Sequence, residues 1–165
     1  MASETLTTVA FSKDVRELLH LLYLHQVCYL IVGGEAVIFY GYARLTGDID
    51  IFYDHRPANV RKLFAALQAF WAGDIPGLRA ADEMRQYGLV VQFGVPPHRI
   101  DLINKVDGVS FASAWPKRET VGLKMKHHIE PIHFIGLREL IANKRAAGRP
   151  KDLDDLRFLK RVRRK

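Results

Sequence analysis

The sequence predicts an α/β fold in which a mixed β-sheet of about four to six strands is flanked by helices. Segments with the apolar spacing of helices alternate along the chain with short runs of β-branched and aromatic residues. Glycine or proline lies at several of the junctions between them. The chain of 165 residues, 48% hydrophobic and 26% charged, suits a single domain over residues 1–165 with a sizeable core.

The N-terminal half alternates between helices and strands. Ser12 can cap a helix over residues 13–25, whose apolar side chains recur on one face. Residues 26–32 are rich in β-branched and aromatic side chains and predict a strand, which Gly33 and Gly34 end. The next predicted elements are a short helix at 35–43, a second strand at 48–53 and a helix from Pro57 to about Phe70.

The C-terminal half predicts a hairpin and a final pair of helices. Before them, residues 77–88 indicate one more helix. The predicted strands are 89–94 and 98–104, joined across Pro96-Pro97, followed by an extended stretch at 119–135 that Pro131 interrupts. The last two helices lie at about 137–147 and 151–163, separated by Gly148 and Pro150, as a helix stop and restart require.

Basic residues concentrate at the C-terminal end. The chain carries a net charge of +7, and residues 138–165 alone hold eleven Lys or Arg against four Asp or Glu. The preceding residues therefore balance to zero. A basic helix pair at about 137–163 on a neutral body predicts an anionic partner such as RNA, DNA or a nucleotide. For the terminal KRVRRK alone, a solubilising tail is an equally good interpretation.

Targeting signals and cysteine usage indicate a cytoplasmic protein. The sequence has no apolar run of the roughly 18 residues that a membrane span needs, and its start lacks the pattern of a signal peptide. The one cysteine, Cys28, has no partner for an internal disulfide. We therefore expect no contact with a membrane.

Two carboxylates lie close to a diglycine turn. Asp48 and Asp50 alternate with Ile49 and Ile51, so both carboxylates share one face of the predicted strand. Two such charges repel unless water or a cation lies between them. Thirteen residues separate Gly34 from Asp48, which is enough for a short helix and a return to the neighbouring strand. We therefore expect the turn, where glycine allows a phosphate to approach the backbone, at the same sheet edge as the carboxylates.

A third aspartate and two loop residues extend this constellation. Asp101 lies between Ile100 and Leu102 and repeats the alternation. Arg44 and Thr46 precede the carboxylate pair and can hold phosphate oxygens, although surface loop residues would look the same. Three carboxylates beside an anion site suit Mg²⁺ (or Mn²⁺) together with a nucleoside triphosphate. Three unrelated surface acids are the plainer alternative.

Together these motifs resemble the nucleotidyltransferase fold of the DNA polymerase β superfamily. That family has a GG or GS turn, then an hDhD strand, then a later third aspartate. Gly33-Gly34, Asp48-Ile49-Asp50 and Asp101 match these features in order. The stretch VGGEAVIFYGYARLTGDIDIFY is most similar to a small bacterial branch that includes abortive-infection toxin nucleotidyltransferases.

The C-terminal segment LIANKRAAGRPKDLDDLRFL supports the same branch. That branch carries a Lys, an Arg and a KDxxD motif, and the matching positions are Lys144, Arg149, Lys151, Asp152 and Asp155. Two plainer interpretations stay open, because Lys144 can be a solvated residue of an amphipathic helix and Asp152 can be an acid at a helix start.

The resemblance implies a metal-dependent nucleotidyltransferase that moves a nucleoside monophosphate from an NTP to a hydroxyl of RNA, tRNA or protein. It also implies a toxin–antitoxin pair with a cognate antitoxin protein. The alternatives are a non-catalytic nucleotide- or RNA-binding module on the same fold and an interaction protein with a basic docking tail. The site residues it implies are Asp48, Asp50 and Asp101 for catalysis and metal, and Gly33, Gly34, Arg44, Thr46 and Lys144 for the nucleotide.

Three histidines form a separate local group. His127, His128 and His133 lie within seven residues. No cysteine accompanies them, and His127 and His128 point to opposite faces of an extended chain. The sequence therefore argues against a zinc site made of these three.

Overall fold

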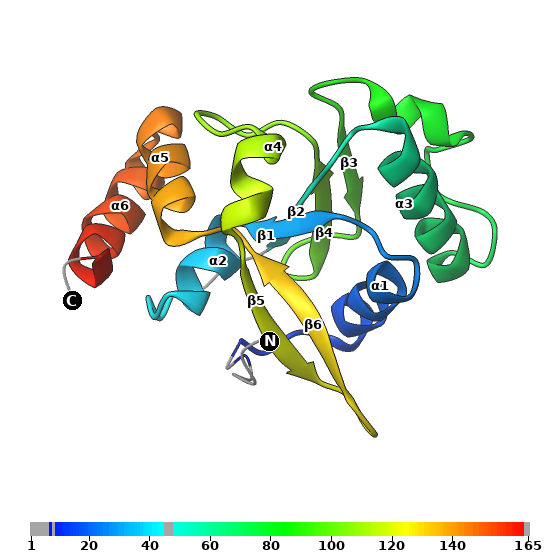
Figure 1. Ribbon diagram of the computed structural model, residues 1–165, viewed down its shortest axis with the longest axis horizontal. Coiled ribbons are helices and arrows are strands. Elements are labelled where there is room, and N and C mark those ends of the chain that lie inside the picture. The colour runs from blue at the N-terminus through cyan, green and yellow to red at the C-terminus, as the bar shows by residue number, and fades with distance from the viewer. Residues whose placement is uncertain (1–6, 8, 45–47, 164–165) are drawn as a thin grey trace.

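The computed structural model describes residues 7, 9–44 and 48–163, and within them the chain forms a six-stranded mixed sheet in the order β3-β4-β2-β1-β6-β5 (Figure 1). The two central strands run antiparallel, whereas β1 with β6 and β2 with β4 run parallel. The strands are β1 (Tyr29–Val32), β2 (Asp48–Tyr53), β3 (Val90–Phe93), β4 (Arg99–Ile103), β5 (Glu119–Lys124) and β6 (Ile129–Phe134). The predicted α/β class with a mixed sheet is confirmed.

Two helix pairs lie at opposite ends of the molecule, with the sheet between them (Figure 1). One pair is α1 with α3 and the other is α5 with α6. The helices are α1 (Lys13–Leu24), α2 (Gly33–Phe39), α3 (Pro57–Phe70), α4 (Phe111–Ala114), α5 (Leu137–Ala147) and α6 (Pro150–Arg163). In the described part of the chain, no helix has both the length and the apolar character to span a membrane.

Several predicted boundaries are confirmed by local physical features. The Ser12 side chain accepts a hydrogen bond from the Val15 N–H and so caps α1. Pro57 occupies the first turn of α3, where its missing N–H costs nothing. Gly148 ends α5 in the left-handed conformation, at φ +63°. Strand β2 coincides with the predicted 48–53.

Two N-terminal boundaries were wrong, and both errors come from the ends of helices. The first strand begins at Tyr29 and not at residue 26, because Gln26 adopts a left-handed φ of +54° and Val27 donates to the Leu22 carbonyl. Residues 26–27 therefore complete the end of α1. Helix α2 includes the diglycine and ends at Phe39.

The C-terminal half departs from prediction at three points. The helix expected at 77–88 is only a 3₁₀ turn at Ala81–Arg85, and the short α4 was not foreseen. Pro131 does not interrupt the chain but pairs opposite Gly122 inside the β5–β6 hairpin. Proline is tolerated there because β6 meets β1 only near its far end, at Phe134, so no second neighbour needs the missing N–H.

Candidate active site

Strands β2 and β4 place three aspartates on one face of the sheet. Asp50 pairs in register with Asp101, and Asp48 pairs with Arg99. In-register neighbours of parallel strands point to the same face, so these four side chains lie together. The alternate residues of both strands are buried in the core on the other face: Ile49, Ile51, Ile100 and Leu102.

The three aspartates line one cleft of about 540 Å³. Gly33, at the end of β1, borders the same cleft, and Lys144 reaches it from α5. Further basic residues line it from the loop after β4 and from the α5–α6 junction: Lys105, Arg149 and Lys151. In this cleft, three carboxylates of the sheet therefore face cations from α5, the α5–α6 junction and the loop after β4.

Burial and the neighbouring carboxylates both act on Asp50. Burial, followed by the neighbouring charges of Asp101 and Asp48, raises the pKa of Asp50 to about 6. The ammonium of Lys144 opposes this shift. Ionisation of Asp50 at neutral pH therefore costs free energy in the folded protein. A cation among the carboxylates would reduce this cost.

Arg99 supplies one such cation, and sequence reasoning missed it. Its Nη2 lies 2.7 Å from Asp48 Oδ2, and its Nε lies 2.9 Å from Asp101 Oδ1. The side chain is 29% exposed and bridges the two strands from within β4. The signal was present in the sequence, since Arg99 lies two residues before Asp101 and therefore shares its face.

Gly33 packs directly against the carboxylate of Asp50. It adopts φ +65°, and a Cβ built on it would lie 2.0 Å from Asp50 Oδ2. Gly34 is buried within the first turn of α2, and the described lining of the cleft includes Gly33 but not Gly34. Only the first glycine of the pair therefore borders the cleft.

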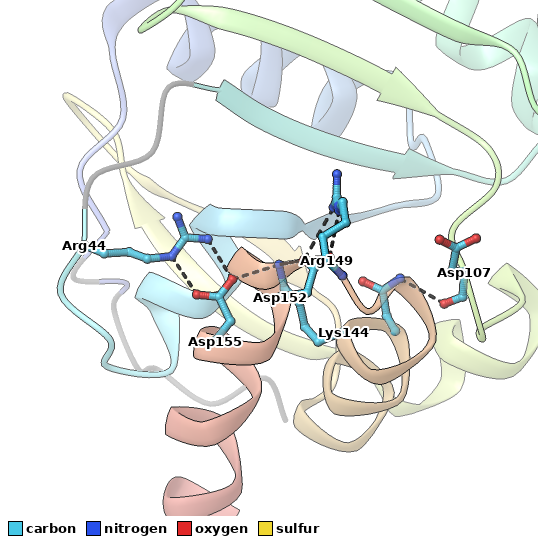
Figure 2. A network of polar contacts seen from close by, with 7 residues as sticks. Arg44, Asp107, Lys144, Arg149, Asp152 and Asp155 are labelled. Carbon is cyan, nitrogen blue, oxygen red and sulfur yellow. Dashed lines mark hydrogen bonds and ion pairs between the residues drawn. The ribbon is translucent and has the colours of Figure 1, made fainter.

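A network of ion pairs joins α5, α6 and the chain before β2 (Figure 2). The Lys144 ammonium lies 3.2 Å from Asp152 Oδ1 and 3.0 Å from Asp155 Oδ2. Arg44 Nε lies 2.9 Å from Asp155 Oδ1, and Arg149 Nε lies 2.7 Å from Asp152 Oδ2. Both carboxylates are buried, so these cations compensate charges that water cannot reach.

This network settles where several predicted residues lie. Lys144 is 3% exposed, so the alternative of a solvated surface lysine is wrong. Asp152 is also buried, and hydrogen bonds from Arg149 and Lys144 outweigh its burial and lower its pKa, so it is more than a helix-start acid. Arg44 contacts α6 and does not line the carboxylate cleft as described. Thr46 lies outside the described residues.

The chain matches a known protein family. A family model described as "nucleotidyltransferase of unknown function (DUF6036)" matches residues 9–161. No curated protein and no solved structure matches the chain. The matched range includes every residue that lines the carboxylate cleft and all of the α5–α6 network.

Proposed function

The chain belongs to this nucleotidyltransferase family, and on that premise we propose that it is a metal-dependent enzyme that transfers a nucleoside monophosphate from an NTP to a hydroxyl acceptor. The observation that carries the proposal is the shared face of Asp48, Asp50 and Asp101, opposite the cations of α5 and the α5–α6 junction. Carboxylates suit a divalent metal and cations suit a triphosphate, and one cleft offers both.

The donor set fits Mg²⁺ or Mn²⁺. Both ions prefer oxygen ligands, and the raised pKa of Asp50 reflects a crowding of negative charge that a divalent cation would relieve. Asp48 and Asp50 would hold the ion that accompanies the triphosphate, and Asp101 would complete the site beside the acceptor. When bound, the metal would neutralise phosphate charge and lower the pKa of the acceptor hydroxyl.

The remaining cleft residues position the reactants. Gly33 lets the end of β1 lie directly against the Asp50 carboxylate, because any side chain at that position would overlap the carboxylate oxygen. Arg149 and Lys151 are exposed at the mouth of the cleft and would bind the β- and γ-phosphates. Arg99 would exchange its carboxylate contacts for phosphate contacts as the metal takes its place.

The reaction balances without a further reagent. The acceptor oxygen forms a bond to the α-phosphorus, the bond from that phosphorus to the bridging oxygen of the β-phosphate breaks, and pyrophosphate leaves. Asp101 would accept the proton of the hydroxyl. Positioning and charge stabilisation supply most of the acceleration in phosphoryl chemistry, and the opposed charges of the cleft support both.

We propose RNA, including the end of a tRNA, as the acceptor ahead of a protein hydroxyl. Residues 138–165 carry eleven Lys or Arg against four acids, and α6 presents Lys160, Arg161 and Arg163 in its last turn. Deleting residues 160–165, which follow the buried Leu159, should weaken RNA binding and reduce its salt dependence. The toxin role, the cognate antitoxin and the cytoplasmic location stay predictions.

A labelling experiment tests the enzyme directly. Wild-type protein with each of the four α-labelled NTPs should transfer label to RNA in the presence of Mg²⁺ but not of EDTA. Asp50→Asn and Asp101→Asn should abolish the transfer, whereas Asp154→Asn should retain it, because Asp154 is an exposed residue of α6. A rise in Tm on addition of NTP and Mg²⁺, without transfer of label to RNA or protein, would instead favour the non-catalytic nucleotide-binding module. An unchanged Tm, again without transfer, would exclude both the enzyme and the non-catalytic module.

A further inference from the structure

A second cluster of ligand-type side chains lies where α1 meets the β5–β6 hairpin. His20 comes from α1, Glu130 from β6 and His128 from the turn before β6. Each offers one ligand atom, and these three atoms lie within 4.8 Å of one another. Among the described lining residues of the carboxylate cleft, none belongs to this cluster. It is therefore a separate place in the molecule.

Both imidazoles converge on a single buried oxygen. His20 Nδ1 lies 2.5 Å and His128 Nε2 lies 2.6 Å from Glu130 Oε1. Glu130 is 1% exposed, and within the described structure its second oxygen, Oε2, is buried without a hydrogen-bond partner. A buried carboxylate with an unsatisfied oxygen is costly, so this arrangement indicates a missing partner for Glu130.

We propose that His20, His128 and Glu130 bind Zn²⁺ or another transition metal ion with the same preference for imidazole and carboxylate ligands. Two imidazole nitrogens and one carboxylate form a three-ligand set that is typical of zinc sites with one open position. Imidazole donors disfavour Mg²⁺, which takes oxygen ligands almost exclusively. The donor chemistry thus separates this cluster from the carboxylate cleft.

The cluster can open to the required size with small movements. Zinc bonds of about 2.0–2.2 Å in tetrahedral geometry place ligand atoms about 3.3 Å apart. The two nitrogens would therefore retreat from Glu130 Oε1 by less than about 1 Å. Their side chains are 33% and 52% exposed for His20 and His128, so both rings have room to move, while the buried Glu130 stays fixed.

An open pocket lies beside the cluster at His20. A pocket of about 550 Å³ adjoins His20 and is also lined by Glu17 and Met125. Glu17 lies one helical turn before His20 on α1, so a water molecule or this carboxylate can complete the coordination. The bound ion would connect α1 to the hairpin, two segments that Arg16 already links through the Lys124 carbonyl.

The sequence could not reveal this cluster, because its members are far apart in the chain. Of His127, His128 and His133, the three histidines that lie close together in sequence, only His128 belongs to this cluster. His133 instead contacts Thr120, with 2.8 Å between Nδ1 and Oγ1. His20 lies 110 residues from Glu130 in sequence.

Calorimetric titration with Zn²⁺, together with Co²⁺ absorption in the visible region, tests the proposal. Wild-type protein should bind one equivalent of Zn²⁺, and bound Co²⁺ should show the visible absorption of an ion with nitrogen ligands. A Zn²⁺ concentration of 100 times Kd should raise Tm by about 5–10 °C. His20→Ala and His128→Ala should each weaken binding by at least about 100-fold. His127→Ala, which alters the exposed neighbour of His128, is the matched control and should bind as wild type does.

Two results of the Zn²⁺ titrations would overturn the proposal. One is equal Zn²⁺ affinity in wild type, His20→Ala and His128→Ala. The other is loss of Zn²⁺ binding in Asp50→Asn, which would place the ion in the carboxylate cleft. Because both histidines are partly exposed, their variants should fold, and far-UV circular dichroism of the metal-free proteins checks this. Unchanged Tm of wild type at saturating Zn²⁺ would also count against the site.

Discussion

Replacing Asp50 with asparagine should stabilise the metal-free protein at neutral pH. Burial, followed by repulsion from Asp101 and Asp48, raises the pKa of Asp50 from 3.8 to about 6. One pKa unit corresponds to about 1.4 kcal/mol, so ionising this carboxyl in the folded protein costs about 3 kcal/mol more than in the unfolded chain. Asparagine has nearly the same shape and avoids that cost.

The direction of the pH dependence follows from the raised pKa. A group with a higher pKa in the folded state favours folding fully below its unfolded pKa, and this contribution disappears as pH rises through the folded pKa. The free energy of unfolding of the wild type should therefore fall by up to about 3 kcal/mol between about pH 4 and pH 7 through Asp50 alone. The Asn variant should lack this component.

Urea unfolding of both proteins at about pH 4 and about pH 8 measures the difference. The variant should be no more stable than wild type at the lower pH and up to about 3 kcal/mol more stable at the higher one. Asp154→Asn, at an exposed position of α6, should show no such change. Millimolar Mg²⁺ at the higher pH should stabilise wild type and leave Asp50→Asn unaffected. If the unfolding free energies of wild type and Asp50→Asn differ by the same amount at both pH values, the reasoning is refuted.

Three further substitutions probe the neighbouring contacts. Gly33→Ala should lower the unfolding free energy by about 1–3 kcal/mol, because φ is +65° and the new methyl group would meet a carboxylate oxygen; an unchanged Tm would contradict this. Lys144→Met should cost about 3 kcal/mol in urea unfolding, since it removes a shared cation from buried Asp152 and Asp155, and a change near zero would show that the arginines suffice. Arg99→Ala should tighten Mg²⁺ binding roughly tenfold in calorimetry by removing a competing cation, and unchanged affinity would place the metal elsewhere.

Local patterns were sufficient wherever one short segment determined the outcome. The alternation around Asp48 and Asp50 assigned β2 and its faces correctly, since side chains on a strand alternate whatever lies beside it. Ser12, Pro57 and Gly148 marked helix ends because caps act within one turn. That the whole chain acts as a single domain stays a prediction.

Contacts between segments that are distant in sequence could not be predicted from these local patterns. The register that places Asp101 beside Asp50 depends on how two strands pair, and nothing within either strand specifies it. Arg44 and Asp155 are 111 residues apart, so their ion pair could not be inferred from spacing. Arg44 was predicted as a phosphate contact, and the structure pairs it with Asp155 of α6.

The buried ion pairs also bear on which cation would meet a phosphate. Lys144 contacts two buried carboxylates, and leaving them would expose those charges to a medium that cannot solvate them, at a cost of about 3–5 kcal/mol. Arg149 contacts Asp152 as well, yet its own side chain is 72% exposed and can stay hydrated when it leaves, while Lys144 still compensates the buried Asp152. A triphosphate can therefore recruit Arg149 far more cheaply than Lys144. Lys144 and Arg44, with the two buried aspartates, would then act as the fixed support, and Arg149 and Lys151 at the mouth of the cleft would bind the nucleotide.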